Sequence, residues 1–128
     1  MLLDITFKII RLAADLERHK FYHEDLKCTN IIRRHADGEI FFIDLGGGLT
    51  RGMYREERES VIRYGDGPDA TDALFTLGRT LWELWTADSP WKDVPLDLIK
   101  DETVRSIIMD CEQGNVESIH CLSEKFSV

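Results

Sequence analysis

The stretch DALFTLGRTLWELWT, residues 72–86, sets the architecture that the rest of the chain must follow. After Asp72, only Arg79 and Glu83 in this stretch carry a charge. A surface helix has one apolar stripe, whereas a helix that is apolar on nearly every side is buried. We therefore predict a buried central helix over 72–86, stopped by Pro90, with the other elements packed around it.

Helical periodicity continues on both sides of this stretch. Within 5–20 the apolar residues recur at the period of an amphipathic helix, at Ile5, Ile9, Leu12 and Leu16. Toward the C-terminus we predict helices over 96–100, 101–112 and 115–126, with Gly114 separating the last two. These elements predict a fold that is mainly helical.

A β-hairpin is predicted between the first helix and the central one. The β-rich runs IIRR (31–34) and EIFFID (39–44) flank Asp37-Gly38, a pair typical of tight two-residue hairpin turns. With that pair at the centre, Ile31 lies opposite Asp44. The side chains of Asn30 and Asp44 then become neighbours at roughly 5–8 Å, a separation that suits two oxygen ligands of one cation. The fold class is thus mainly α with a small β-hairpin (α+β).

Composition excludes several classes of function. The chain has 128 residues, the size of one domain or of part of one, and no apolar run near the ~20 residues of a membrane helix. A net charge of -8 argues against a nucleic-acid partner. The first residues do not have the pattern of a secretory signal, so we expect a cytoplasmic or nuclear protein. Cys28, Cys111 and Cys121 show no metal-ligand or redox spacing, which favours reduced thiols.

Two motifs carry a resemblance to a known family. The run HEDLKCTN (23–30), followed after the hairpin by DLG (44–46), resembles the catalytic loop and the metal-binding D-F-G element of eukaryotic-type protein kinases. The run TLGRTLWELWTADSPW (76–91) resembles the buried helix of the kinase large lobe. The resemblance is strong over 7–91 and loose in the tail. It implies that 1–128 is a kinase-like large lobe, with an activation-like segment over 47–71, the buried helix over 72–86 and a helical tail over 92–128.

The resemblance also implies a role for each polar residue of the motifs. Asp25 would orient a substrate hydroxyl and accept its proton, and Lys27 would neutralise the γ-phosphate of ATP. Asn30 and Asp44 would hold Mg²⁺ against the nucleotide phosphates, and Gly46 would let the chain turn after the metal ligand. Taken singly, Asp25 would be a turn or capping acid, Lys27 a surface lysine, and Asn30 the beginning of a strand. Their order and spacing together favour phosphoryl transfer.

The sequence departs from the family at four places. Glu24 replaces the arginine that normally receives an activation-loop phosphate, so we expect no activation through a phosphorylated loop. The segment 47–71 has no A-P-E element. The aspartate usual five residues before the helix glycine is Ala73 here, with Asp72 one place early. No glycine-rich loop or V-A-I-K lysine precedes the first helix, so a small lobe is not part of this sequence.

Three functions remain open from the sequence. The first is the large lobe of an ATP-dependent serine/threonine-type protein kinase, weak or inactive as an isolated chain. The second is a catalytically silent, pseudokinase-like binding module. The third is a small-molecule phosphotransferase of the aminoglycoside-kinase type, against which Lys27 and the D-x-G after the hairpin argue. The expected partner is a protein substrate or a docking protein of unknown identity, without nucleic acid or membrane, and the sequence predicts no oligomeric state.

Overall fold

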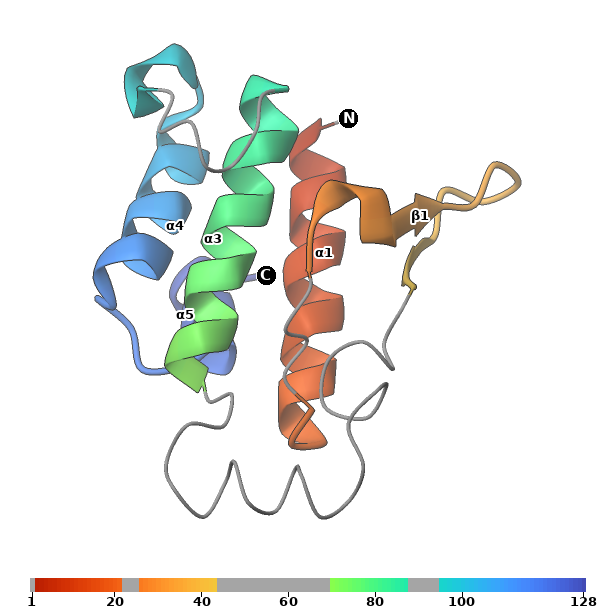
Figure 1. Cartoon of the computed structure of the whole chain (residues 1–128), viewed down its shortest axis with the longest axis horizontal. Helices are drawn as coiled ribbons and strands as arrows, with labels where there is room; N and C mark the ends of the chain where they lie inside the picture. The colour runs from red at the N-terminus through yellow and green to blue at the C-terminus, as the bar shows by residue number, and fades with distance from the viewer. Residues whose placement is uncertain (1, 22–25, 44–69, 88–94) are drawn as a thin grey trace.

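The computed structural model describes residues 2–21, 26–43, 70–87 and 95–128. These residues form a mainly helical structure with one two-stranded antiparallel sheet, as the sequence predicts. Figure 1 shows the three longer helices side by side, with the hairpin on the side of α1 that faces away from α4. The elements are α1 (Leu2–Arg18), η1 (Cys28–Asn30), β1 (Ile31–Arg33), β2 (Ile40–Phe42), α3 (Ala70–Thr86), η3 (Leu96–Leu98), α4 (Glu102–Gln113) and α5 (Ile119–Lys125).

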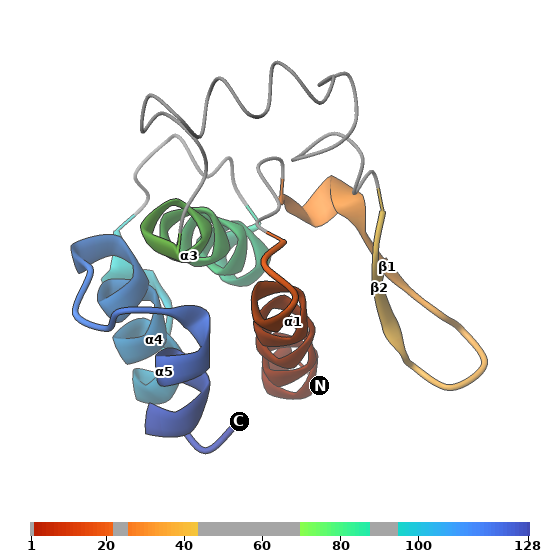
Figure 2. The same ribbon diagram turned by 90° about the horizontal axis from the view of Figure 1, so that it is seen from below.

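Helix α3 occupies the centre and contacts α1, α4, α5 and η1. It lies alongside both α1 and α4, and α5 packs on α1 (Figure 2). Leu74, Leu77 and Leu81 have at most 1% of their surface exposed, so the central position predicted for 72–86 is confirmed. The helix begins two residues earlier than predicted. One side remains open, because Phe75 is 38% exposed.

Most of the other buried side chains come from the helices that pack around α3. Each helix contributes the apolar residues of the stripe that faces its neighbours. The buried hydrophobic residues of these helices are Ile9, Ile10 and Ala13 of α1, Val104, Ile107, Ile108 and Cys111 of α4, and Ile119 and Leu122 of α5.

Helices α3 and α4 approach each other closely at Gly78. A Cβ atom at this position would lie 2.6 Å from the Cβ of Cys111, a distance that side chains do not tolerate. The same contact includes a largely buried ion pair, in which Arg79 Nε lies 2.6 Å from Glu112 Oε1. The absence of a side chain at Gly78 therefore sets how closely α4 can pack on α3.

Helix α1 ends at a left-handed residue, and near its beginning it is bonded to α3. The helix ends at Arg18 instead of Lys20, because Lys20 adopts a left-handed conformation (φ +61°) and the Phe21 amide donates back to the Leu16 carbonyl. Near its beginning, the buried Thr6 accepts a hydrogen bond of 2.8 Å from the indole of Trp85 in α3. This bond ties the first helix to the last turn of the central one.

The helices of the C-terminal part begin where a cap is present. Asp101 accepts a hydrogen bond from the Val104 amide and starts α4, which ends at Gly114 with φ +66° as predicted. The helix predicted over 96–100 is wrong. Only the three-residue turn η3 forms there, and no side chain caps it.

Helix α5 is shorter than the predicted 115–126 because its cap lies at Ser118, whose hydroxyl accepts from the Cys121 amide. The carboxylate of Glu17 in α1 also accepts hydrogen bonds from the amides of Ile119 and His120, at 2.9 and 3.1 Å. A negative charge at a helix N-terminus satisfies free N–H groups and is favoured by the helix dipole. The start of α5 is thus determined by a residue about 100 positions earlier in the chain.

Candidate functional site

The hairpin has a different register from the one predicted. Ile31 pairs with Phe42 and Arg33 with Ile40, and the Ile43 amide donates to the Asn30 carbonyl at 2.8 Å. The loop contains four residues, 35–38, of which only Gly38 has a positive φ (+74°). Asp37 does not form half of a primed turn. Its carboxylate binds Arg34 and the Glu39 amide.

This correction changes the neighbour of Asn30. Ile43, and not Asp44, lies opposite it in the ladder. The prediction that Ile31 faces Asp44 is therefore wrong, because the turn is two residues longer than the Asp37-Gly38 pattern implies. Asp44 itself lies outside the described residues, so the predicted separation of Asn30 and Asp44 stays a prediction.

The turn that precedes the hairpin gives its two predicted site residues opposite environments. The backbone N–H of Asn30 donates to the Lys27 carbonyl at 2.8 Å, which closes the short helical turn η1. Lys27 stands at its N-cap in an extended conformation (φ -160°, ψ 164°), and its side chain is exposed. Asn30 is 7% exposed. Lys27 is thus exposed and Asn30 buried, although they lie only three residues apart in the same turn.

Helix α3 holds this turn through two polar side chains. The hydroxyl of Thr80, a residue 1% exposed, lies 2.9 Å from the Leu26 carbonyl, and one carboxylate oxygen of Glu83 accepts a 2.9 Å hydrogen bond from the Cys28 amide. Thr80 and Glu83 lie three residues apart and therefore share a face of the helix. We call these two residues the α3 clamp.

Cys28 is the thiol closest to the predicted site. Its Sγ approaches the Thr80 carbonyl at 3.5 Å. Burial, followed by the hydrogen bond and the negative charge of Glu83, raises the pKa of the Cys28 thiol to about 12. A thiol that stays protonated at neutral pH is a poor nucleophile, so the site has no activated cysteine at Cys28.

The outer surface of the hairpin is apolar. Ile32 and Phe41 pair across the strands, and Ile43 continues the same side, with exposed fractions of 48%, 43% and 39%. We call these three residues the hairpin face. The opposite side packs toward α1 through the buried Ile40 and Phe42. A two-stranded antiparallel sheet with one face in water normally alternates apolar and polar residues, whereas this hairpin is apolar on both faces.

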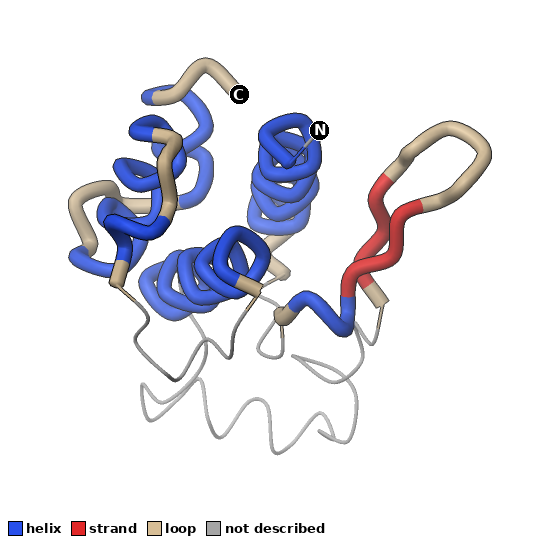
Figure 3. Tube along the Cα trace, turned by 90° about the horizontal axis from the view of Figure 1, so that it is seen from above, coloured by secondary structure: helices blue, strands red, loops and turns tan. Residues whose placement is uncertain are grey.

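The hairpin projects from the helices (Figure 3), and its face borders the predicted site because Ile43 lies opposite Asn30. Arg34 places its guanidinium 5.0 Å from the centre of the Phe41 ring, at the far end of the face. The hairpin therefore places an open apolar surface next to the turn that carries Lys27 and Asn30.

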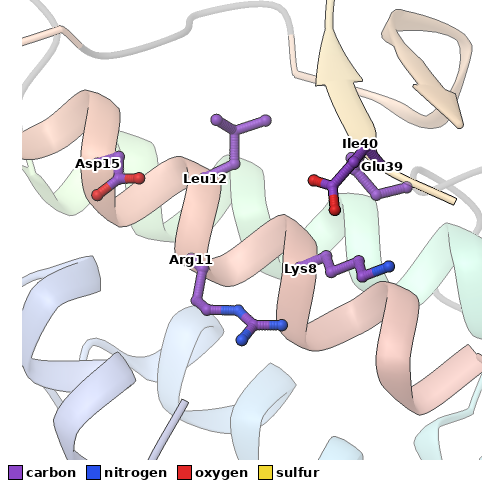
Figure 4. Close-up of a pocket in the computed structure, with 6 residues that line it drawn as sticks. All are labelled: Lys8, Arg11, Leu12, Asp15, Glu39 and Ile40. Atoms are coloured by element: carbon purple, nitrogen blue, oxygen red, sulfur yellow. The ribbon is translucent and has the colours of Figure 1, made fainter. Parts of the chain in front are cut away.

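A groove of about 320 Å³ lies between α1 and β2 (Figure 4). Lys8 donates to the Gly38 carbonyl at 3.1 Å and so joins the helix to the hairpin loop at one end of this groove. The groove is lined by two cations, two carboxylates and two aliphatic side chains: Lys8, Arg11, Asp15, Glu39, Leu12 and Ile40. Positive and negative groups are balanced, so the lining favours no particular ligand charge, and none of the predicted site residues belongs to it.

Three of the five predicted site residues, Asp25, Asp44 and Gly46, lie outside the described part of the chain. Within the described part, no group of three histidines, cysteines or acids is arranged to hold a metal ion. The helices described there do not combine the length and the apolar content needed to cross a membrane.

Comparison with known proteins identifies no relative: no family model, curated protein or solved structure matches the chain.

Sequence reasoning missed the α3 clamp. A signal was present, since Thr80 and Glu83 are polar residues three apart in a helix that is mostly apolar. A buried polar side chain needs a hydrogen-bond partner, but the sequence alone does not say which of the distant backbone groups provides it.

Proposed function

We propose that the chain is the large lobe of a serine/threonine-type protein kinase, which transfers a phosphoryl group from Mg²⁺-ATP to a protein hydroxyl. The observation that carries the proposal is the closed turn from Lys27 to Asn30, next to the hairpin face. A nucleotide needs a cation for its phosphates and an apolar surface for its base. Lys27 supplies the first, and the hairpin face supplies the second.

The chemistry assigned to each residue follows from the charge on the reacting phosphate. In phosphoryl transfer the protein mainly positions the reactants and stabilises the charge that is spread over the phosphate oxygens. Lys27 neutralises a γ-phosphate oxygen, and its side chain is exposed on the turn. Asp25 orients the substrate hydroxyl and accepts its proton.

Mg²⁺ would be held by the amide oxygen of Asn30 and the carboxylate of Asp44. Such hard oxygen donors are the ligands that Mg²⁺ prefers, and the ion supplies counter-charge to the phosphates. Gly46 gives the backbone freedom directly after Asp44. The same proposal places the protein in the cytoplasm or nucleus with a protein substrate as its partner.

The proposal is tested by a thermal-shift titration of the chain with ATP, with and without Mg²⁺. We expect the midpoint of unfolding to rise with ATP only when Mg²⁺ is present, because a ligand that binds the folded state stabilises it. Asp25→Asn should keep this shift and abolish phosphoryl transfer to a protein substrate. No shift at millimolar ATP would contradict nucleotide binding, and unchanged turnover in Asp25→Asn would contradict the role of Asp25.

A second candidate is a silent binding module, and the hairpin face favours it as well. Exposed apolar patches on a protein often mark a site of protein association. If the chain docks a protein there, ATP should cause no shift, and the hairpin face should become protected from solvent exchange in the complex. The thermal-shift titration therefore separates the two candidates.

A further inference from the structure

The α3 clamp contacts the turn of the candidate site on both sides of Lys27. Thr80 approaches the Leu26 carbonyl, and Glu83 accepts from the Cys28 amide. These two backbone groups belong to the residues directly before and after Lys27. Side chains alternate sides along an extended chain. Leu26 is buried, the Cys28 thiol approaches the Thr80 carbonyl, and the extended Lys27 between them is exposed.

The same contacts extend to Asn30. Its amide donates to the Lys27 carbonyl, so a movement of the Leu26–Cys28 backbone also changes the position of Asn30. Both clamp residues lie in the run 76–91 that resembles the kinase buried helix, and each contacts backbone 54 or 55 positions earlier in the chain. The buried helix thus determines where both described site residues lie.

We propose that Thr80 and Glu83 are positioning residues, which hold Lys27 where it meets the phosphates of a nucleotide and Asn30 where it would hold Mg²⁺. This inference rests on the proposed function. The two contacts differ in character. The Thr80 hydroxyl is one proton donor placed between two carbonyls, those of Leu26 (2.9 Å) and Thr76 (2.8 Å). Glu83 offers a carboxylate to an amide, a charge-assisted hydrogen bond that is stronger than a neutral one.

Two pairs of variants separate the hydrogen bonds from the shapes of the side chains. Thr80→Val removes the hydroxyl at nearly constant volume, and Thr80→Ser keeps it. Glu83→Ala removes the acceptor, and Glu83→Gln keeps an acceptor without the charge. Thr86→Val is the matched control, because Thr86 lies in the same helix and its hydroxyl bonds only the Trp82 carbonyl one turn earlier.

The first measurement is hydrogen exchange of the Cys28 and Asn30 amides without nucleotide, with the α4 amides as the internal reference. Loss of one partner should raise the exchange rates of these two amides about tenfold or more in Thr80→Val and Glu83→Ala. Thr80→Ser, Glu83→Gln and Thr86→Val should stay near the wild type. Unchanged exchange in both disruptive variants, with α4 unaffected, would overturn the inference.

The second measurement is the Kd for Mg²⁺-ATP, from the thermal-shift titration of the same variants. Thr80→Val and Glu83→Ala should weaken binding about tenfold, because Lys27 and Asn30 lose their orientation. If the wild type binds Mg²⁺-ATP and both variants bind it equally well, the positioning role is wrong and the proposed function stands. If the wild type does not bind, the proposed function fails, and the role toward phosphates fails with it.

If the α3 variants also raise the hydrogen-exchange rates of the α4 amides, the result would indicate a general loss of structure. For that outcome a variant of the turn itself keeps the test decisive. Cys28→Pro removes the N–H that Glu83 accepts and leaves α3 unchanged. Proline suits the first position of a helical turn and requires an extended residue before it, as Lys27 is. In the Cys28→Pro background, Glu83→Ala should weaken Mg²⁺-ATP binding no further. An equal loss in both backgrounds would show that Glu83 acts by another route.

Discussion

At the scale of single residues, two charged side chains of the buried helix α3 each bind a specific partner in another part of the chain. Arg79 pairs with Glu112 of α4 and stacks between the rings of Phe75 and Trp82, each 5.1 Å from its guanidinium carbon. Glu83 bonds the turn before the hairpin and adds to the effect of burial, which is the main reason that the pKa of the Cys28 thiol is raised. Arg79 and Glu83 thus each have a specific partner, as partly buried charges require.

The raised pKa of Cys28 predicts how stability depends on pH. In the folded protein the pKa of the Cys28 thiol is about 12, whereas the ordinary value, which applies to the unfolded chain, is 9.0. The stabilisation is therefore complete below about pH 9 and is lost as the pH rises from 9 toward 12. Urea unfolding across this range should show a shallower fall in the free energy of unfolding for Cys28→Ala than for the wild type.

Cys121→Ala is the control for this prediction, since its thiol belongs to α5. Cys111 adds to the same trend in every variant, because burial raises the pKa of that thiol too. Equal slopes for Cys28→Ala and the wild type would contradict the prediction.

At the scale of elements, capping and close contact determine where each helix begins and how it packs. Helix α4 begins at the cap Asp101, and α5 begins where Ser118 and Glu17 satisfy its first amides. The contact between α3 and α4 depends on Gly78, whose missing side chain leaves room for Cys111. The starts of α4 and α5 and the packing of α3 on α4 are thus each decided by a few direct contacts, one of which joins residues 102 positions apart in the chain.

Gly78→Ala should lower the free energy of unfolding by about 1–3 kcal/mol, because the added Cβ would lie 2.6 Å from the Cβ of Cys111. In an ordinary helix the same change stabilises by up to about 1 kcal/mol, so the sign of the effect is diagnostic. Urea denaturation measures it. Cys111→Ala keeps the opposing Cβ and should not rescue Gly78→Ala. A stabilised Gly78→Ala variant would show that the two helices have room to separate.

At the scale of the whole molecule, the helices form one body and the hairpin extends from it with an open apolar face (Figure 3). The inner side of the hairpin contributes Ile40 and Phe42 to the core, and Lys8 fastens its loop to α1. The outer side contributes less to stability than the inner side, since its three residues are 39–48% exposed. Substitutions on the outer side of the hairpin should therefore affect ligand binding more than the free energy of unfolding.

Ile32→Ser should weaken Mg²⁺-ATP binding roughly fivefold to tenfold, because the base of the nucleotide loses apolar contact area. The urea midpoint should change little, within about 0.5 kcal/mol of unfolding free energy, since Ile32 is 48% exposed. Leu98→Ser is the matched control: Leu98 is 61% exposed and lies on η3. Equal losses of affinity in the two variants would remove the hairpin face from the proposed site.

The sequence by itself determined α1, α3, α4, α5 and the existence of the hairpin, because apolar periodicity, Gly114 and the β-rich runs act over a few residues. The register came only from the tertiary structure. Asp37-Gly38 indicates a two-residue turn, but the packing of Ile40 and Phe42 on α1 and the bond from Lys8 to Gly38 accompany a four-residue loop. The α3 clamp was decided in the same way, since a buried hydroxyl or carboxylate needs a partner and only the folded chain brings one within reach.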